Sequence, residues 1–305
     1  MMDFSTCKVN RFKYYGGKNG HKLSILCHNE RYMLKFPPLN PAKNNSRYTN
    51  SCFSEDICCR IFNSVGIRAQ ETVLGVYREK SKEKIVVACK DFEQSPWKLQ
   101  EFAELKNSCI ETSQSGYGTE LTEVLETIAQ QQIMDPIVLE SFFWDMFIVD
   151  AFIGNFDRHN GNWGFLLNEQ EEKAVIAPVY DCGSCLYPQI SDENIAAIME
   201  DEEQIDARIF VFPTSALKQG GEKINYATFI TGLKHQGCNG ALKRIFPRID
   251  METINQIIDE TPYISEIRKR FYKKMLEARK EAILDVAYYA LLEQEIEEEN
   301  KAGNP

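Results

Sequence analysis

One polar segment lies between two strongly apolar ones in the middle of the chain, and it restricts the possible folds most. The apolar residues 142–152 predict a buried helix, and residues 163–167 predict a short strand. Between them, Asp157 and Asn162 stand five residues apart among loop-forming residues. This spacing is typical of phosphotransferase catalytic loops, in which the Asp receives the proton of the substrate hydroxyl and the Asn holds Mg²⁺.

A second acidic residue, Asp181, supports this interpretation. It follows the apolar segment 174–180, which predicts a buried strand, and it begins the sequence Asp-Cys-Gly. The charged residues 168–173 predict the tip of a hairpin that folds Asp181 back beside Asn162. Both side chains could then reach one metal ion, and Mg²⁺ prefers such oxygen ligands. A surface hairpin with ordinary Asx turns is the alternative.

The first 36 residues predict a β-rich start with a glycine-rich turn. This turn separates two segments of alternating hydrophobicity and contains Gly16, Gly17 and Gly20. These glycines allow a tight hairpin whose backbone approaches a ligand closely, as a loop that covers phosphates requires. Most glycine-rich hairpins only turn the chain, so the pattern alone leaves both interpretations open.

Lys35 and Glu55 form a candidate ion pair. Lys35 stands in the apolar strand 31–36, where a lysine without a partner is unfavourable. Glu55 lies on a helix predicted over 52–63, away from its apolar face. In kinases a strand Lys contacts the nucleotide phosphates and pairs with a Glu of the next helix. A solvated glutamate on the helix surface is the alternative for Glu55.

After this helix the sequence first predicts further strands and then becomes mainly helical. Two further strands, the second over 84–89, complete a small β-rich lobe. We expect the chain to cross into a larger lobe at Cys89 to Asp91, where backbone groups could contact an adenine ring. The prediction is therefore an α+β, two-lobed fold, with residues 1–92 in the first lobe and 93–305 in a mainly helical second lobe.

The second lobe is predicted from apolar periodicity and from clusters of loop-forming residues. Pro136 stands at the helix N-terminus, a position that proline tolerates. We expect helices at 97–107, 119–132, 136–152, 191–210, 251–260 and 264–299, and loops at 108–118 and, around one short helix, at 218–240.

Whole-chain composition is that of a globular protein and argues against some functions. Of 305 residues, 43% are hydrophobic and 26% charged, and the net charge of −10 argues against a general nucleic-acid-binding surface. The sequence lacks an apolar run long enough to span a membrane, and the N-terminus lacks the basic and apolar regions of a signal peptide. We expect a cytoplasmic protein without integral membrane association; export without a recognisable signal peptide is left open.

Ten cysteines predict free thiols in a reducing compartment rather than a disulfide framework. Cys182 and Cys185 form a Cys-x-x-Cys motif that needs separate consideration. A zinc site would need a second pair of ligands, and Cys58 and Cys59 are adjacent, which is the wrong spacing. A redox motif would open a helix, whereas this one follows a strand. We favour buried free thiols, with a zinc or redox protein as an alternative.

Taken in order, the glycine turn, strand Lys, helix Glu, Asp-Arg-His-Asn-Gly-Asn and Tyr-Asp-Cys-Gly resemble the HipA-like serine/threonine protein kinases. The similarity is greatest to the smaller members of this family and covers most of the chain, as far as Arg248 and Asp250. The resemblance implies a protein-kinase-like fold with ATP in the cleft and Mg²⁺ as the metal ion. It also implies transfer of phosphate to a Ser or Thr hydroxyl of a protein substrate, including this chain itself.

Matching positions imply the roles of individual residues. Asp157 matches the catalytic base, and Asn162 and Asp181 match the Mg²⁺ ligands. His159 stands where the family's loop His approaches the nucleotide phosphates; a hydrogen bond that orients the loop is its alternative. Together with the residues where the chain crosses between the lobes, the candidate cofactor-binding residues are Gly16, Gly17, Asn19, Gly20, Lys22, Lys35, Glu55, Cys89, Asp91, His159, Asn162 and Asp181.

The sequence also departs from ordinary protein kinases. Asn155 and Phe156 precede Asp157 in place of the usual His-Arg, and no Ala-Pro-Glu segment follows Asp181. Asp-Arg-His-x-x-Asn followed by Asp-x-Gly is also the pattern of phosphatidylinositol kinases, so lipid phosphorylation is the nearest alternative. The acidic composition and the lack of a basic amphipathic helix count against it. A nucleotide-binding pseudokinase that acts by protein contact is a further alternative.

Overall fold

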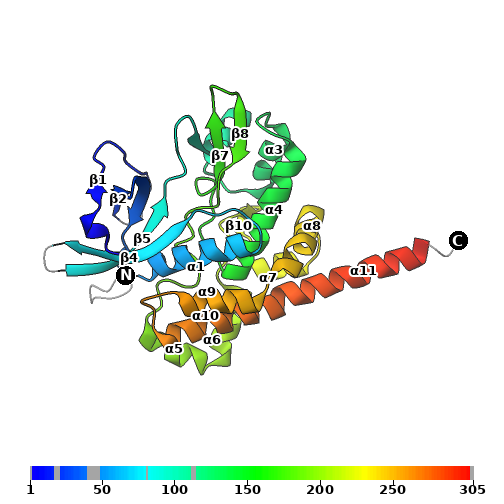
Figure 1. Ribbon diagram of the computed structural model, residues 1–305. Helices are drawn as coiled ribbons and strands as arrows, with labels where there is room; N and C mark the ends of the chain where they lie inside the picture. The colour runs from blue at the N-terminus through cyan, green and yellow to red at the C-terminus, as the bar shows by residue number, and fades with distance from the viewer. Residues whose placement is uncertain (1, 17–20, 40–48, 80–81, 111–114, 303–305) are drawn as a thin grey trace.

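The computed structural model describes residues 2–16, 21–39, 49–79, 82–110 and 115–302. A β-sheet with one helix against it forms the N-terminal part, and the rest of the chain forms a larger, mainly helical part (Figure 1). This is the two-part α+β arrangement that the sequence predicts.

The N-terminal sheet is antiparallel and has the strand order β1-β2-β3-β5-β4. Its register places Lys22 opposite Lys35, and Lys35 opposite Val87. Since directly opposite residues share one face of a sheet, both lysines lie on the same side. The strands are β1 (Lys8–Val9), β2 (Lys22–Cys27), β3 (Glu30–Lys35), β4 (Thr72–Glu79) and β5 (Lys82–Lys90).

Helix α1 (Ser51–Ser64) lies between this sheet and α9 (Met251–Glu260). Because the helix is covered on more than one side, residues off its apolar face are buried too. Asp56 is one of them, and its carboxylate accepts a hydrogen bond from Thr72 on β4 at 2.8 Å.

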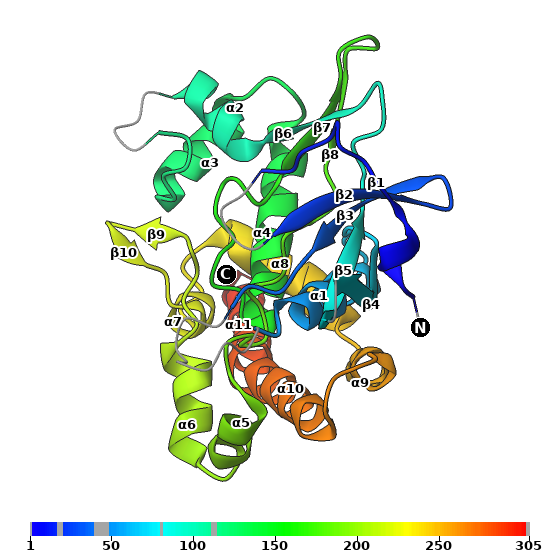
Figure 2. The same cartoon turned by 90° about the vertical axis from the view of Figure 1, so that its left-hand side faces the viewer.

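Helix α4 (Pro136–Ile153) runs through the middle of the helical part (Figure 2). Asp135 caps its first turn by accepting a hydrogen bond from the Ile137 N–H at 2.9 Å, and Pro136 occupies the first turn as expected. Gly154 ends the helix with φ 66°, a left-handed conformation that favours glycine. The chain therefore turns sharply out of the core just before Asp157.

The helix predicted over 97–107 is partly wrong. Strand β6 (Lys98–Glu101) comes first, and α2 (Phe102–Cys109) follows it. The β6 strand pairs with β7 (Gly164–Asn168), which in turn pairs with β8 (Lys173–Ile176) in a three-stranded sheet. Hydrogen bonds to a strand more than sixty residues away thus override the local helical pattern.

The strand predicted over 174–180 is shorter than expected. Its ladder with β7 ends at Ile176, and Val179 forms only an isolated bridge with Ala69. Asp181 therefore lies in a loop, with φ 59°.

Two other predicted segments are also divided differently. The helix expected over 191–210 is interrupted where Asp201 caps a new helix by accepting from the Gln204 N–H. The segment 218–240 contains a short hairpin and two helices instead of one, because Asn225 caps the first of them. The remaining α-helices and β-strands are α3 (Leu121–Gln130), α5 (Asp192–Met199), α6 (Glu202–Asp206), β9 (Lys218–Gln219), β10 (Glu222–Lys223), α7 (Tyr226–Thr231), α8 (Gln236–Ile245), α10 (Glu266–Arg279) and α11 (Val286–Ala302).

The expectation that all thiols are free is wrong for one pair. Cys7 and Cys27 form a disulfide, with a Cα–Cα distance of 5.2 Å. The β1–β2 ladder explains this, because Lys8 pairs with Leu26 and the two cysteines lie one step beyond that pair. The other eight cysteines are free. None of the described helices combines the length and apolar character that a membrane-spanning segment needs.

Candidate active site

A cleft of about 1020 Å³ lies between the N-terminal sheet and the helical part. Its size is sufficient for a ligand as large as a nucleotide. The residues around it come from β2, β3, α1, β5, β6 and the connecting loops, including those on either side of the β7–β8 hairpin. The polar side chains among them include Lys22, Lys35, Glu55, Glu101, Tyr117, Asp157, His159, Asn162, Asp181 and Ser184.

Asp157 is held by the residues that leave α4. The Asn155 side chain donates to Asp150 at 2.7 Å and accepts a hydrogen bond from the Asp157 N–H at 3.0 Å. Partial burial raises the pKa of Asp157, and the negative charge of Asp181 acts in the same direction. Ser184 Oγ lies 3.5 Å from Asp157 Oδ2, at the outer limit of a hydrogen bond. Asp157 therefore presents its carboxylate to the cleft from a fixed loop.

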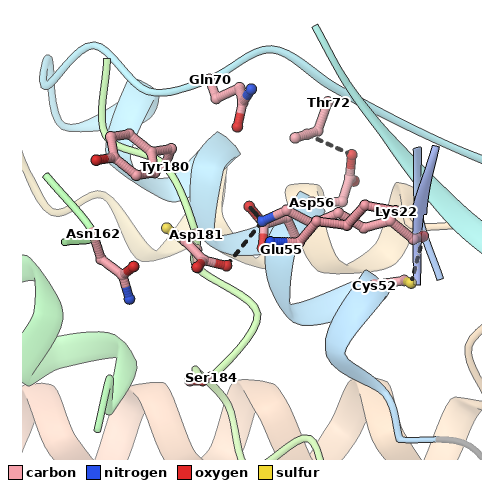
Figure 3. A network of polar contacts seen from close by, with 12 residues as sticks. Lys22, Cys52, Glu55, Asp56, Gln70, Thr72, Asn162, Tyr180, Asp181 and Ser184 are labelled. Carbon is pink, nitrogen blue, oxygen red and sulfur yellow. Dashed lines mark hydrogen bonds and ion pairs between the residues drawn. The ribbon is translucent and has the colours of Figure 1, made fainter. Parts of the chain in front are cut away.

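Asn162 is oriented by the same loop. Its Nδ2 donates to the Asp157 carbonyl oxygen at 2.7 Å, and its backbone N–H donates to the His159 carbonyl oxygen at 2.8 Å. Figure 3 shows the Asn162 amide oxygen on the side that faces Asp181. The spacing of Asp157 and Asn162 thus brings the two side chains to one cleft wall.

His159 makes a hydrogen bond that orients its loop, which was the alternative expected for it. Its Nδ1 accepts from the Gly161 N–H at 3.0 Å, which places the proton of a neutral ring on Nε2. The imidazole also lines the cleft. An approach to the nucleotide phosphates stays a prediction.

Lys35 lies between two carboxylates. Its Nζ is 2.9 Å from Glu55 Oε1 and 2.9 Å from Asp181 Oδ1. Lys35 holds the pKa of Asp181 at about 2, whereas burial raises the pKa of Glu55 to about 6 although Lys35 opposes this. Burial opposes the charge of Lys35 itself, but Asp181 and Glu55 keep its pKa well above the usual value.

Glu55 is only 1% exposed, so the solvated alternative is wrong. A Cβ atom at Gly183 would lie 3.2 Å from Glu55 Oε2. The glycine of the Asp-Cys-Gly sequence therefore leaves room for the buried carboxylate beside Lys35.

Lys22 adds a second positive charge beside Lys35. Its Nζ donates to the Gly16 carbonyl oxygen at 2.6 Å. Burial and the neighbouring charge of Lys35 lower the pKa of Lys22. The other predicted residues of the glycine turn, Gly17, Asn19 and Gly20, lie outside the described residues.

Cys89 and Asp91 are not among the described residues that line the cleft. The Asp91 carboxylate instead accepts hydrogen bonds from the Tyr15 hydroxyl at 2.8 Å and the Arg31 guanidinium at 3.3 Å. The Asp91 backbone N–H donates to the Arg31 carbonyl oxygen at 2.8 Å. An adenine contact at this crossing stays a prediction.

Arg158 is a site residue that sequence reasoning missed. Its guanidinium is buried against Asp150, and its Nη1 donates to the carbonyl oxygens of Asn162 at 2.9 Å and Tyr180 at 2.5 Å. It thereby joins the loop of Asp157 to the loop of Asp181. Asp150 carried a usable signal, because a carboxylate in an otherwise apolar buried helix needs a cationic partner.

Glu101 and Tyr117 were missed as well. Both line the cleft, and the Tyr117 hydroxyl donates to Glu101 Oε2 at 2.9 Å. Their signal in the sequence is weak because the β6 strand that places Glu101 depends on pairing with β7.

Comparison with known proteins identifies the family. Residues 18–266 match the HipA-like C-terminal domain. The chain belongs to the HipA-like family. It is 47% identical, over all its 305 residues and 93% of the relative, to serine/threonine-protein kinase CtkA of Helicobacter pylori (strain J99).

Solved structures agree with this assignment. The crystal structure of a Helicobacter pylori proinflammatory kinase CtkA matches with a TM-score of 0.90 and 48% identity, over 96% of this chain and 98% of that one. HipA from Shewanella oneidensis MR-1, solved with HipB and operator DNA, matches with a TM-score of 0.57 and 14% identity, over 92% of this chain and 70% of that chain. The second match bears on the fold alone. The expected family and the protein-kinase-like fold are both confirmed.

Proposed function

We propose that this chain is a serine/threonine protein kinase that transfers the γ-phosphoryl group of ATP to a protein hydroxyl, with Mg²⁺ as the metal and with itself among its substrates. Identity of 47% to a serine/threonine-protein kinase along the whole chain supports the reaction class. The observation that carries the assignment of residues is the convergence of Asp157, Asn162 and Asp181 on one cleft that also contains Lys35.

The donor atoms fit a hard divalent cation. Asp181 supplies a carboxylate, and Asn162 supplies an amide oxygen because its Nδ2 is already bonded to the Asp157 carbonyl. Within the described ranges, no group of three or more His, Cys, Asp or Glu side chains forms a closed metal site. Mg²⁺ characteristically uses one or two protein ligands and completes its shell with water and phosphate oxygens.

Each residue has a distinct task in this proposal. When bound, ATP supplies the transferable phosphoryl group, and Mg²⁺ neutralises negative charge on the phosphates. Asp157 aligns the acceptor hydroxyl and takes its proton, a task that the raised pKa of Asp157 favours. Lys35 and Lys22 present positive charge to the phosphates, and Glu55 keeps Lys35 in position.

Arg158 contributes without reaching the reacting atoms. Its hydrogen bonds fix the carbonyls of Asn162 and Tyr180, and Tyr180 directly precedes Asp181. The two proposed metal ligands therefore stand in a set position before any ligand arrives, which lowers the reorganisation that transfer requires.

Labelled phosphate tests this proposal. Purified protein is incubated with γ-labelled ATP and Mg²⁺ alone, with a generic protein substrate, or with vesicles that contain inositol lipids, beside Asp157→Ala. Label on Ser or Thr with the wild type, and none with the variant, is expected. Label on inositol lipids alone would favour a lipid kinase, and ATP binding without transfer would favour a pseudokinase; both results would contradict the proposal.

A further inference from the structure

Four buried cysteines, which we call the thiol cluster, meet directly behind the proposed metal loop. Cys58 and Cys59 belong to α1, and Cys182 and Cys185 belong to the loop that follows Asp181. All four are 0% exposed. The Cys182 thiol is a neighbour of the Cys59 and Cys185 thiols, and the Cys185 thiol is also a neighbour of the Cys58 thiol. The proposed phosphotransfer uses none of these thiols.

The thiol cluster connects the two elements that carry the carboxylates around Lys35. Glu55 stands one helical turn before Cys59 on α1, and Asp181 directly precedes Cys182. Cys182 Sγ also accepts a hydrogen bond from Arg158 Nη2 at 3.4 Å. A covalent change at Cys182 would therefore act on the Asp181 loop and on its attachment to the loop of Asp157.

The geometry favours oxidation over metal binding. In the part of the chain that the structure describes, no three of these or other ligand side chains are arranged to hold a metal ion. Cys59 on α1 and Cys182 on the loop are neighbouring thiols, which is the arrangement that a disulfide between them requires. Cys182 is buried, but both of its neighbours in the sequence, Asp181 and Gly183, line the cleft, so a small oxidant has least protein to cross from that side.

We propose that Cys59 and Cys182 form a disulfide when the protein meets hydrogen peroxide, and that this bond lowers kinase activity. The two thiols lose two electrons and two protons, and one S–S bond forms. The O–O bond of one peroxide molecule breaks, and the peroxide takes up these electrons and protons as two molecules of water.

The structural consequence follows from the bond length. An S–S bond of about 2.05 Å draws Cys182 toward α1 and away from the Arg158 guanidinium. Asp181 then moves relative to Asn162, and the proposed metal site loses its set geometry. Only this effect on activity rests on the proposed function; disulfide formation itself is measured separately.

Peptide mapping tests the bond directly. Wild-type protein is treated with hydrogen peroxide, alkylated after unfolding without reductant, and cleaved after Lys and Arg. Cys59 then lies in the peptide 48–60, and Cys182 lies in the peptide 174–208. The expected product is a covalent link between these peptides that dithiothreitol removes. Cys59→Ala should abolish the link, whereas Cys58→Ala and Cys185→Ala should retain it.

Activity is measured on the same samples, each compared with its own untreated protein. Oxidised wild type should lose about tenfold or more in phosphate transfer and recover it with dithiothreitol, since disturbing groups behind a metal site has effects of this size. Oxidised Cys59→Ala should lose much less. A link confined to peptide 174–208, no link at all, or a link that leaves activity unchanged would each overturn the proposal.

Discussion

The guanidinium of Arg158 and the carboxylate of Asp150 form a buried pair, with Arg158 Nε 2.9 Å from Asp150 Oδ2. Asp150 belongs to the central helix α4, and Arg158 follows the proposed catalytic base. From this fixed position Arg158 donates to the loops of both proposed metal ligands. The arrangement of the site therefore depends on a pair in which neither residue lines the cleft.

Replacing Arg158 by Met should destabilise the protein, because it leaves the Asp150 charge buried without its partner. Removing one member of a buried ion pair costs about 3–5 kcal/mol. Urea unfolding measures this loss. Arg60→Met is the matched control, since Arg60 pairs with Glu260 on the surface and its loss should change stability little. An Arg158→Met protein as stable as the wild type would contradict this account of the pair.

Glu55 should make stability depend on pH in a defined direction. Burial raises the pKa of Glu55 from its usual 4.5 to about 6, so the folded state binds more protons than the unfolded state between these values. Its contribution to the free energy of unfolding therefore falls as pH rises from about 4.5 to about 6. Urea unfolding across this interval should show wild type losing stability relative to Glu55→Gln as pH rises. A constant difference would show that Glu55 does not titrate there.

Asp181 should make stability depend on pH in a lower interval than Glu55 does. Lys35 lowers the pKa of Asp181 from its usual 3.8 to about 2. Its contribution to stability is therefore present above pH 3.8 and is lost as pH falls toward 2. Acid unfolding of Lys35→Met should therefore lack the loss of stability that Asp181 causes in the wild type between pH 3.8 and about pH 2. An unchanged acid profile would contradict the ion pair of Lys35 and Asp181.

Much of the site could be predicted from the sequence because its key residues are close neighbours in short segments. Asp157 and Asn162 are held by hydrogen bonds within one loop, so their spacing alone places them together. Lys35 could be predicted because it is a charged residue in an apolar strand, and Glu55 because kinases pair such a strand Lys with a Glu of the next helix.

What the sequence did not predict depends on contacts between distant segments. The β6 strand forms only because Lys98–Glu101 meets β7, and the disulfide forms because β1 and β2 align Cys7 with Cys27. The role of Arg158 likewise requires that the loops of Asn162 and Tyr180 come together. No local sequence pattern predicts these contacts between distant segments.

Lys35→Met should lower phosphate transfer about 10²–10³-fold, because removing one preorganised electrostatic contact to a transition state has this effect on kcat. Steady-state kinetics with varied ATP measures it. Lys98→Met is the matched control, since Lys98 is exposed on β6 and does not line the cleft. Equal activities of the two variants would contradict the assignment of Lys35.

Asn162→Ala should raise the Mg²⁺ concentration needed for half-maximal activity by at least about tenfold. EDTA should abolish activity of the wild type. Asn239→Ala serves as the control, because Asn239 lies on α8, away from the cleft, and its amide donates to the Leu233 carbonyl that precedes this helix. An unchanged Mg²⁺ requirement in Asn162→Ala would remove Asn162 from the proposed metal site.

The central claim is that Asp157 takes the proton of the acceptor hydroxyl, and Asp157→Asn tests it most directly. The substitution keeps the size of the side chain and removes its basicity. We predict that kcat for phosphate transfer to protein falls about 10²–10⁴-fold while ATP affinity stays within about twofold of wild type. Transfer at the wild-type rate by the folded variant would contradict the claim.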